Sequence, residues 1–242
     1  MDVKETLPRK SWLTACGWCI LFVLVSVQAC RSPQDSKPSS TTHQADLLAL
    51  EPDSLSGEFT DWGLSERENW QKPQVVISAL GDLHDKVVAD IGAGTGYFTL
   101  PLARVAKKVI AVDIEQLFLE HIRKRLARIP EREALEVDIR HTIPDNPALK
   151  PSEADVVLLV NTYSFIDRRV QYFDLVKRGL SRSGRMVVVD FKHAELPVGP
   201  PLEEKITPLQ IIQELDSAGF RHVSTDSNSL EYQFIVVVEK KP

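Results

Sequence analysis

The stretch Val87-Val-Ala-Asp90-Ile-Gly92-Ala-Gly94-Thr-Gly96-Tyr-Phe-Thr99 decides the fold, because an apolar strand runs here straight into a glycine-rich turn and then into a helix. Glycine tolerates positive φ angles and has no Cβ, so such a turn lets the backbone come close to a ligand. The turn ends at a helix N-terminus, whose free N–H groups favour a carboxylate or a phosphate. We therefore predict a binding site at the carboxyl end of this strand.

The spacing of the glycines separates two kinds of nucleotide cofactor. NAD-binding turns have the spacing G-x-G-x-x-G, whereas Gly92, Gly94 and Gly96 give G-x-G-x-G. Asp90 stands two residues ahead of the first glycine, where a carboxylate repels a pyrophosphate but suits the ammonium and sulfonium charges of S-adenosylmethionine. We predict S-adenosylmethionine as the cofactor, and a tight turn in a non-binding α/β domain is the alternative.

A second acidic residue, Asp113, ends the next apolar run, Val109–Asp113. A carboxylate at the carboxyl end of a second strand can accept hydrogen bonds from both hydroxyls of a ribose. We predict this role for Asp113, with an ordinary helix cap ahead of Glu115 as the alternative.

Around these two strands, short β-branched runs alternate with helical patterns, which is typical of βαβ units. Two further extended segments at the C-terminus are joined by a turn too short for a crossover helix, so they must pair antiparallel. We predict an α/β fold with helices on both faces of a mostly parallel, seven-stranded sheet that ends in an antiparallel hairpin. The expected strands are 87–91, 109–113, 135–140, 155–160, 185–190, 222–226 and 232–238, and the expected helices are 73–80, 97–106, 116–129, 168–180 and 209–218, with an irregular polar segment ahead of the first helix.

Asp90 to Gly96 and Asp113 resemble motifs I and II of the class I S-adenosylmethionine-dependent methyltransferases, which have a Rossmann-like fold. Four further segments are similar to a bacterial branch of that family related to the quinone and arsenite methyltransferases: 67–73, 144–149, 161–163 and 197–201. The resemblance implies that Asp145 contacts the adenine amine, that Ile114 packs on the adenine ring, and that Asn161 lines the cleft toward which the transferred methyl points. It implies methyl transfer to a small or membrane-associated acceptor, without a metal.

The sequence departs from this branch after Tyr163, where Ser164-Phe165 replaces paired histidines. If the acceptor must lose a proton, Tyr163 and His193 are the candidate bases, although His193 also fits a solvated loop. Two alternatives stay open: a module that binds S-adenosylmethionine or a nucleoside without turnover, and an NAD-dependent oxidoreductase.

The segment that carries Trp70 has two possible roles. A large aromatic side chain among polar neighbours either covers the cofactor as part of a lid or packs the first helix onto the sheet.

The N-terminus has the layout of an export signal, with basic residues, an uncharged run from Ser11 to Ala29, and then Cys30. The end of this run, Val27-Gln28-Ala29-Cys30, resembles the bacterial lipobox, so we predict lipidation of Cys30 and a domain that faces the periplasm. An uncleaved anchor or a cytoplasmic protein is the alternative. The expected domains are a signal segment at 1–29, a Ser/Thr/Pro-rich tether at 30–56 and the catalytic domain at 57–242.

Composition limits the partners. A net charge of −5 argues against a nucleic-acid surface, which is usually a basic patch. All three cysteines lie within the first thirty residues, so the rest of the chain has no disulfide, thiolate metal site or catalytic cysteine.

Overall fold

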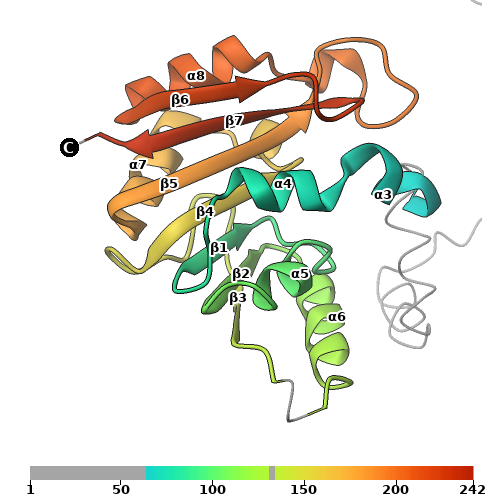
Figure 1. The fold of residues 1–242 in the computed structure, drawn as a ribbon. Coiled ribbons are helices and arrows are strands. Elements are labelled where there is room, and N and C mark those ends of the chain that lie inside the picture. The colour runs from blue at the N-terminus through green and yellow to red at the C-terminus, as the bar shows by residue number, and fades with distance from the viewer. Residues whose placement is uncertain (1–63, 131–133, 242) are drawn as a thin grey trace, which may run out of the picture. The chain divides into compact units, whose positions relative to one another are not determined.

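The computed structural model describes residues 64–130 and 134–241, which form a seven-stranded sheet in the order β3-β2-β1-β4-β5-β7-β6 (Figure 1). All pairings from β3 to β5 are parallel, whereas β7 pairs antiparallel with both β5 and β6. The predicted fold class is confirmed. The strands are β1 Val87–Ile91, β2 Lys108–Asp113, β3 Val137–His141, β4 Ala154–Val160, β5 Leu180–Phe191, β6 Phe220–Asp226 and β7 Gln233–Lys240.

Helices cover both faces of the sheet. In Figure 1, α4 crosses in front of the strands and α7 lies behind them. Alternate residues along each strand therefore enter two separate apolar layers, so that Val157 and Val188 pack with the helices α7 and α8, while Val88 and Val187 pack with α4 and α5. The helices are α3 Leu64–Gln71, α4 Pro73–Ala79, α5 Thr99–Ala103, α6 Gln116–Leu126, α7 Arg169–Gly179 and α8 Pro208–Ser217, with short 3₁₀ turns η2 Tyr163–Phe165 and η3 Leu202–Glu204.

The centre of the sheet is apolar because both of its faces are covered. Strands β1 and β4, which pair with each other, are buried along nearly their whole length. Such strands appear in the sequence as continuous β-branched runs instead of alternating ones. Their carboxyl ends meet at one edge, where the glycine-rich turn follows β1 and Asn161 follows β4.

The prediction of an irregular segment ahead of the first helix is wrong, because residues 64–71 form the helix α3. Its sequence has little amphipathic pattern, and it is held by contacts with distant parts of the chain: Trp70 packs on Phe191, and Gln71 bonds to Gln233. Several element boundaries also differ from the prediction, most of all those of α5 and β5. Helix α5 is shorter than expected, and β5 begins five residues early, at Leu180, opposite an irregularity in β4.

The predicted signal segment 1–29, the tether 30–56 and Cys30 lie outside the described residues. Within the part of the chain that the structure describes, no helix is both long enough and apolar enough to cross a membrane.

An ion-pair clasp holds the connection between β3 and β4. The guanidinium of Arg140 binds both carboxylate oxygens of Glu153, at 2.7 and 2.8 Å, and also Asp138 and the carbonyl of Ala148. Hydrogen bonds from Arg140 lower the pKa of Glu153 to about 2.

We predict that Glu153→Gln lowers the free energy of unfolding at pH 7 by on the order of 2 kcal/mol, since the carboxylate is mostly buried in this clasp. The folded-state pKa of Glu153 lies below its unfolded value, so the stabilisation is present above pH 4.5 and is lost as the pH falls toward 2. Urea unfolding at pH 7 and pH 3 measures it. A difference between variant and wild type that does not shrink at pH 3 would contradict the role of the clasp.

Candidate functional site

The three glycines of the turn after β1 all have positive φ angles, of 75°, 53° and 83°, but they serve different purposes. A Cβ at Gly92 would lie 2.1 Å from the hydroxyl oxygen of Thr162, and one at Gly96 would lie 2.9 Å from Ile122. Both glycines thus allow close packing within the protein. Among the described residues, a Cβ at Gly94 would meet nothing within 4 Å, so the backbone at Gly94 leaves room for a ligand.

Asp113, at the end of β2, fastens this turn. One carboxylate oxygen accepts a hydrogen bond from Gly94 N at 2.7 Å, and the other accepts from Glu115 N at 2.9 Å. The second bond closes a short turn ahead of α6. It is not a capping contact, because the N-cap of α6 is Glu115 and no side chain caps this helix. Because a carboxylate can accept up to about four hydrogen bonds, Asp113 keeps capacity for a ribose.

Asp90 is buried behind the turn and accepts a hydrogen bond from the hydroxyl of Thr99 at 2.7 Å. Burial raises the pKa of Asp90 to about 6, although the Thr99 bond and the charge of Arg67 act in the opposite direction. The guanidinium of Arg67 lies over the ring of Tyr97, 4.0 Å from its centre. A carboxylate held this way is a ready partner for a cationic group on a ligand.

A hollow of about 90 Å³ lies beside Asp113, with mostly apolar walls suited to one face of a planar ring. Ile114, which is 48% exposed, lies on it as predicted for the adenine contact. Asp145 is not on the hollow itself. It follows the lining residue Pro144 and forms an ion pair with Arg168. The lining residues are Ile91, Gly92, Val112, Asp113, Ile114, Thr142, Ile143, Pro144, Thr162, Phe165, Ile166 and Tyr172.

Asn161 belongs to a row of hydrogen-bonded side chains that we call the amide relay: Arg67, Gln71, Gln233 and Asn161. Arg67 Nε donates to Gln71 Oε1, Gln71 Nε2 donates to Gln233 Oε1 at 2.9 Å, and Gln233 Nε2 donates to Asn161 Oδ1. The relay joins α3 to the ends of β7 and β4. Sequence reasoning named Asn161 but missed Gln233, because nothing local marks a glutamine on the last strand.

Comparisons with known proteins agree with this geometry. Residues 89–186 match the family model described as a methyltransferase domain. A probable S-adenosylmethionine-dependent methyltransferase of Mycolicibacterium smegmatis is 27% identical over 69% of this chain and 65% of its own length. The ribosomal RNA small subunit methyltransferase A of Koribacter versatilis is 42% identical over 26% of this chain and 22% of its own length.

The fold is shared with solved structures. A SAM-dependent methyltransferase from Aquifex aeolicus superposes with a TM-score of 0.68 at 19% identity, over 78% of this chain and 98% of that one. The chain is thus similar to the methyltransferase-domain family over residues 89–186, and it shares its fold with S-adenosylmethionine-dependent methyltransferases. It spans less than two thirds of the length of the two curated relatives described above.

The residues at the carboxyl ends of β1 and β2 fit S-adenosylmethionine, the cofactor that these comparisons imply. The open face at Gly94, the carboxylates of Asp90 and Asp113, and the apolar hollow at Ile114 lie in succession along the carboxyl ends of β1 and β2. Their chemistry is compatible with S-adenosylmethionine: Asp90 and the turn at Gly94 suit its amino-acid part, Asp113 suits the ribose, and the hollow suits the adenine. No side chain from residues 64–130 or 134–241 lies within 4 Å of a Cβ built on Gly94.

The two candidate bases do not meet at this site. Tyr163 is fully buried, stacks on Phe173, and donates its hydroxyl to Glu214 at 2.9 Å. Burial raises the pKa of Tyr163 well above its usual range, which opposes a role as a base at neutral pH. His193 is exposed in the loop after β5, 3.1 Å from the carbonyl of Lys205, as expected of a solvated loop histidine.

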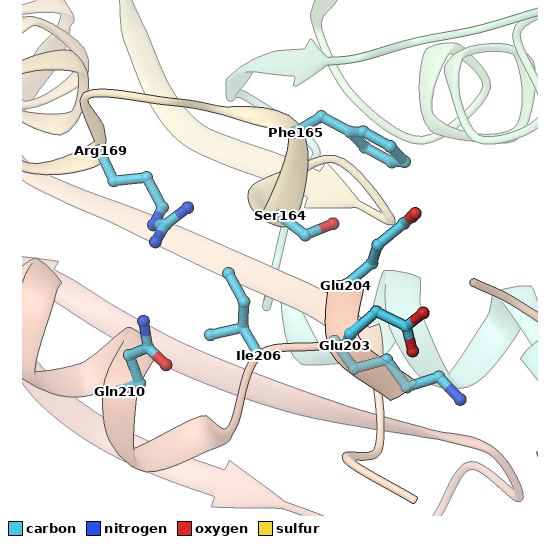
Figure 2. A pocket seen from close by; sticks show the side chains of 8 residues that line it. Ser164, Phe165, Arg169, Glu203, Glu204, Ile206 and Gln210 are labelled. Atoms are coloured by element: carbon cyan, nitrogen blue, oxygen red, sulfur yellow. The ribbon is translucent and has the colours of Figure 1, made fainter. Parts of the chain in front are cut away.

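A larger cleft of about 490 Å³ opens on the other side of η2 (Figure 2). Figure 2 shows the carboxylate of Glu204 on the side of Ser164 and Phe165, and Arg169 turned toward Gln210. Asp190 is the next-to-last residue of β5, at the same edge of the sheet, and sequence reasoning missed it. It is buried, with Oδ2 lacking a hydrogen-bond partner among the described residues, and burial raises its pKa to about 6. The cleft is lined by Ser164, Phe165, Arg169, Glu203, Glu204, Lys205, Ile206 and Gln210.

Of the two roles considered for Trp70, a lid over the cofactor or packing of a helix onto the sheet, the structure shows packing. Its indole ring is buried between Phe191 and Tyr232, with ring centres 5.8 and 6.1 Å away. It therefore anchors α3 onto the sheet.

Substituting alanine at two glycines separates packing from binding. Both changes strain a positive φ, at a cost of about 1 to 2 kcal/mol, but Gly92→Ala also drives a methyl group into Thr162. We expect Gly92→Ala to lower the free energy of unfolding by about 2 to 5 kcal/mol in total. Gly94→Ala should cost only the strain, yet weaken binding of S-adenosylhomocysteine.

Thermal unfolding and calorimetric titration measure the two effects. Equal destabilisation by both variants, or unaltered affinity in Gly94→Ala, would show that Gly94 does not face the ligand.

Proposed function

We propose that this protein binds S-adenosylmethionine and transfers its methyl group to a small or membrane-associated acceptor. The observation that carries the proposal is the bond from Gly94 N to Asp113, which places an open backbone turn and a ribose-type carboxylate side by side. The similarity of residues 89–186 to a methyltransferase domain, and of the chain to a probable S-adenosylmethionine-dependent methyltransferase, supports the same cofactor.

When bound, S-adenosylmethionine supplies an electrophilic methyl on a positively charged sulfur. The chain's own task is to hold and orient, and orientation alone can remove roughly 7 to 11 kcal/mol from the barrier of a two-reactant step. Asp90 would bind the ammonium, Asp113 the ribose hydroxyls, and Ile114 one face of the adenine, with Asp145 near the adenine amine. Asn161, level with the turn on the neighbouring strand, would face the acceptor.

The acceptor would approach over the carboxyl ends of β4 and β5, where open α/β sheets bind ligands. Asp190, near the end of β5, would be a better candidate base than Tyr163, because its Oδ2 has no hydrogen-bond partner among the described residues and its pKa of about 6 suits proton transfer near neutral pH. The motifs at 67–73, 144–149, 161–163 and 197–201 support a place in the branch related to quinone and arsenite methyltransferases.

A small acceptor is favoured over nucleic acid on charge. The chain carries a net charge of −5, and acidic residues Glu203 and Glu204 line the larger cleft. The relative from Koribacter versatilis is named for ribosomal RNA. An activity screen should therefore include RNA as a competing acceptor beside the small molecules.

The cofactor assignment predicts that Asp113→Ala weakens S-adenosylhomocysteine binding by about 1.5 to 3 kcal/mol, as for hydrogen bonds to a charged group. Asp155→Ala is the matched control, because Asp155 also accepts a backbone bond, from Val87 N at 3.0 Å, but at the opposite edge of the sheet. Calorimetric titration of both variants measures the change.

Titration of wild type with NAD, and a radiolabelled methyl-transfer assay, separate the rival functions. Tight NAD binding would favour an oxidoreductase. Cofactor binding with no turnover on any acceptor would favour the binding module. Equal affinities of the Asp113 and Asp155 variants would refute the ribose contact.

We also propose that Cys30 is lipidated and that the domain faces the periplasm, on the basis of the lipobox-like Val27–Cys30. In a Gram-negative host, Cys30→Ala should abolish lipid labelling and membrane fractionation, whereas Cys19→Ala should keep both. An intact N-terminus on wild-type protein recovered from the cytoplasm would count against this location.

A further inference from the structure

The amide relay has a direction, and this direction decides which atom Asn161 offers to the acceptor. A guanidinium contains only donors, so Arg67 Nε must face an oxygen of Gln71. The amide nitrogen of Gln71 then faces Gln233, so the side-chain oxygen of Gln233 must accept this hydrogen bond, at 2.9 Å. Gln233 in turn presents its nitrogen to Asn161 Oδ1.

The opposite orientation of these amides is excluded by their burial. Gln71 and Gln233 are fully buried. Turning over either amide alone would bring two oxygens or two N–H₂ groups face to face, and no water could relieve the conflict. The assignment of nitrogen and oxygen along the relay therefore follows from the donor at its start.

Asn161 is the end of the relay. Its oxygen is occupied by Gln233, and its Nδ2 makes no hydrogen bond to the described residues. Asn161 follows β4, which pairs with β1, so it lies level with the glycine turn, and its φ of 54° sets it apart from the strand. Asparagine tolerates this left-handed conformation better than most residues.

We propose that Asn161 presents a fixed N–H₂ donor to the methyl acceptor, and that the acceptor is an oxygen nucleophile such as a phenolate or an enolate. This inference rests on the proposed methyltransferase function. An oxyanion has several lone pairs, so one can accept from Asn161 while another attacks. An amine uses its single lone pair for the attack, so it has none left to accept a hydrogen bond. Its remaining N–H groups are donors and would face the donor of Asn161.

The charge of Arg67 strengthens this preference. Hydrogen bonds in a chain polarise one another, and here the cation stands at the donor end. Each amide N–H further along becomes a better donor, so the N–H₂ of Asn161 suits a negative atom. Gln71 and Gln233 act as positioning residues, because they reach the acceptor only through Asn161.

A single substitution should reverse the relay. In Gln71→Glu the new carboxylate can accept from Arg67 but cannot donate, so Gln233 must turn its N–H₂ toward it. Asn161 then has to donate to Gln233 and expose Oδ1. Gln74→Glu is the matched control, since it adds the same charge at an exposed position on the neighbouring helix α4. Gln233→Glu is a second route to the same reversal if the first variant does not fold.

The first measurement is the exchange of the Asn161 side-chain N–H₂ protons with water by NMR, with the signal assigned through Asn161→Asp. We expect fast exchange in wild type and Gln74→Glu, and exchange of one proton slowed at least about tenfold in Gln71→Glu. This measurement needs no cofactor. Slow exchange in wild type, or no change in both reversing variants, would overturn the direction of the relay.

The second measurement compares two probes of nearly the same shape, 4-nitrophenol and 4-nitroaniline, in the presence of S-adenosylhomocysteine. We expect wild type and Gln74→Glu to bind the phenolate at least about tenfold more tightly than the aniline, and Gln71→Glu to lose or reverse this preference. Equal or absent affinity for both probes would overturn the acceptor class. Failure of wild type to bind S-adenosylhomocysteine would instead refute the proposed function, while the exchange measurement would still report on the relay.

Discussion

The hydrogen bonds that fasten the glycine turn to β2 are the constraint on which the site depends. Gly92 N and Ala93 N both donate to the carbonyl of Val112, and Gly94 N donates to the side chain of Asp113. Successive N–H groups can converge on neighbouring acceptors in a tight turn that combines right- and left-handed backbone conformations, and Gly92 and Gly94 supply the positive φ angles. The glycines therefore let the end of β1 bind the end of β2, and the ligand-facing side of the turn is left open.

Much of the fold was predictable because its signals are local. Strand β1 and the start of α6 agree with the prediction to the residue, since β-branched runs and helical spacing are set by neighbours in sequence. The antiparallel end of the sheet followed from a connection too short for a crossover. Helix α3 was not predicted, because it is stabilised by contacts with residues far away in the sequence, including Phe191 and Gln233.

The site was predictable only in part, for the same reason. Asp90, the glycines and Asp113 stand next to strand ends that the sequence reveals, and the structure brings them together. Tyr163 also follows a strand end, but the 3₁₀ turn at Tyr163–Phe165 rotates its ring into the core against Phe173. Whether a side chain after a strand faces the cleft or the core depends on the packing of distant helices, which residue spacing does not encode.

The amide relay also has a consequence for how the protein is made. Arg67 and Gln71 lie near the start of the domain, whereas Gln233 lies on its last strand, 162 residues after Gln71. A ribosome releases the chain from the N-terminus, so β1, β2 and the glycine turn leave it well before β7 does. The glycine turn can thus form on the nascent chain, but Asn161 acquires its fixed orientation only after β7 has left the ribosome. The ordering of Asn161 is in this way delayed until all seven strands of the sheet are present.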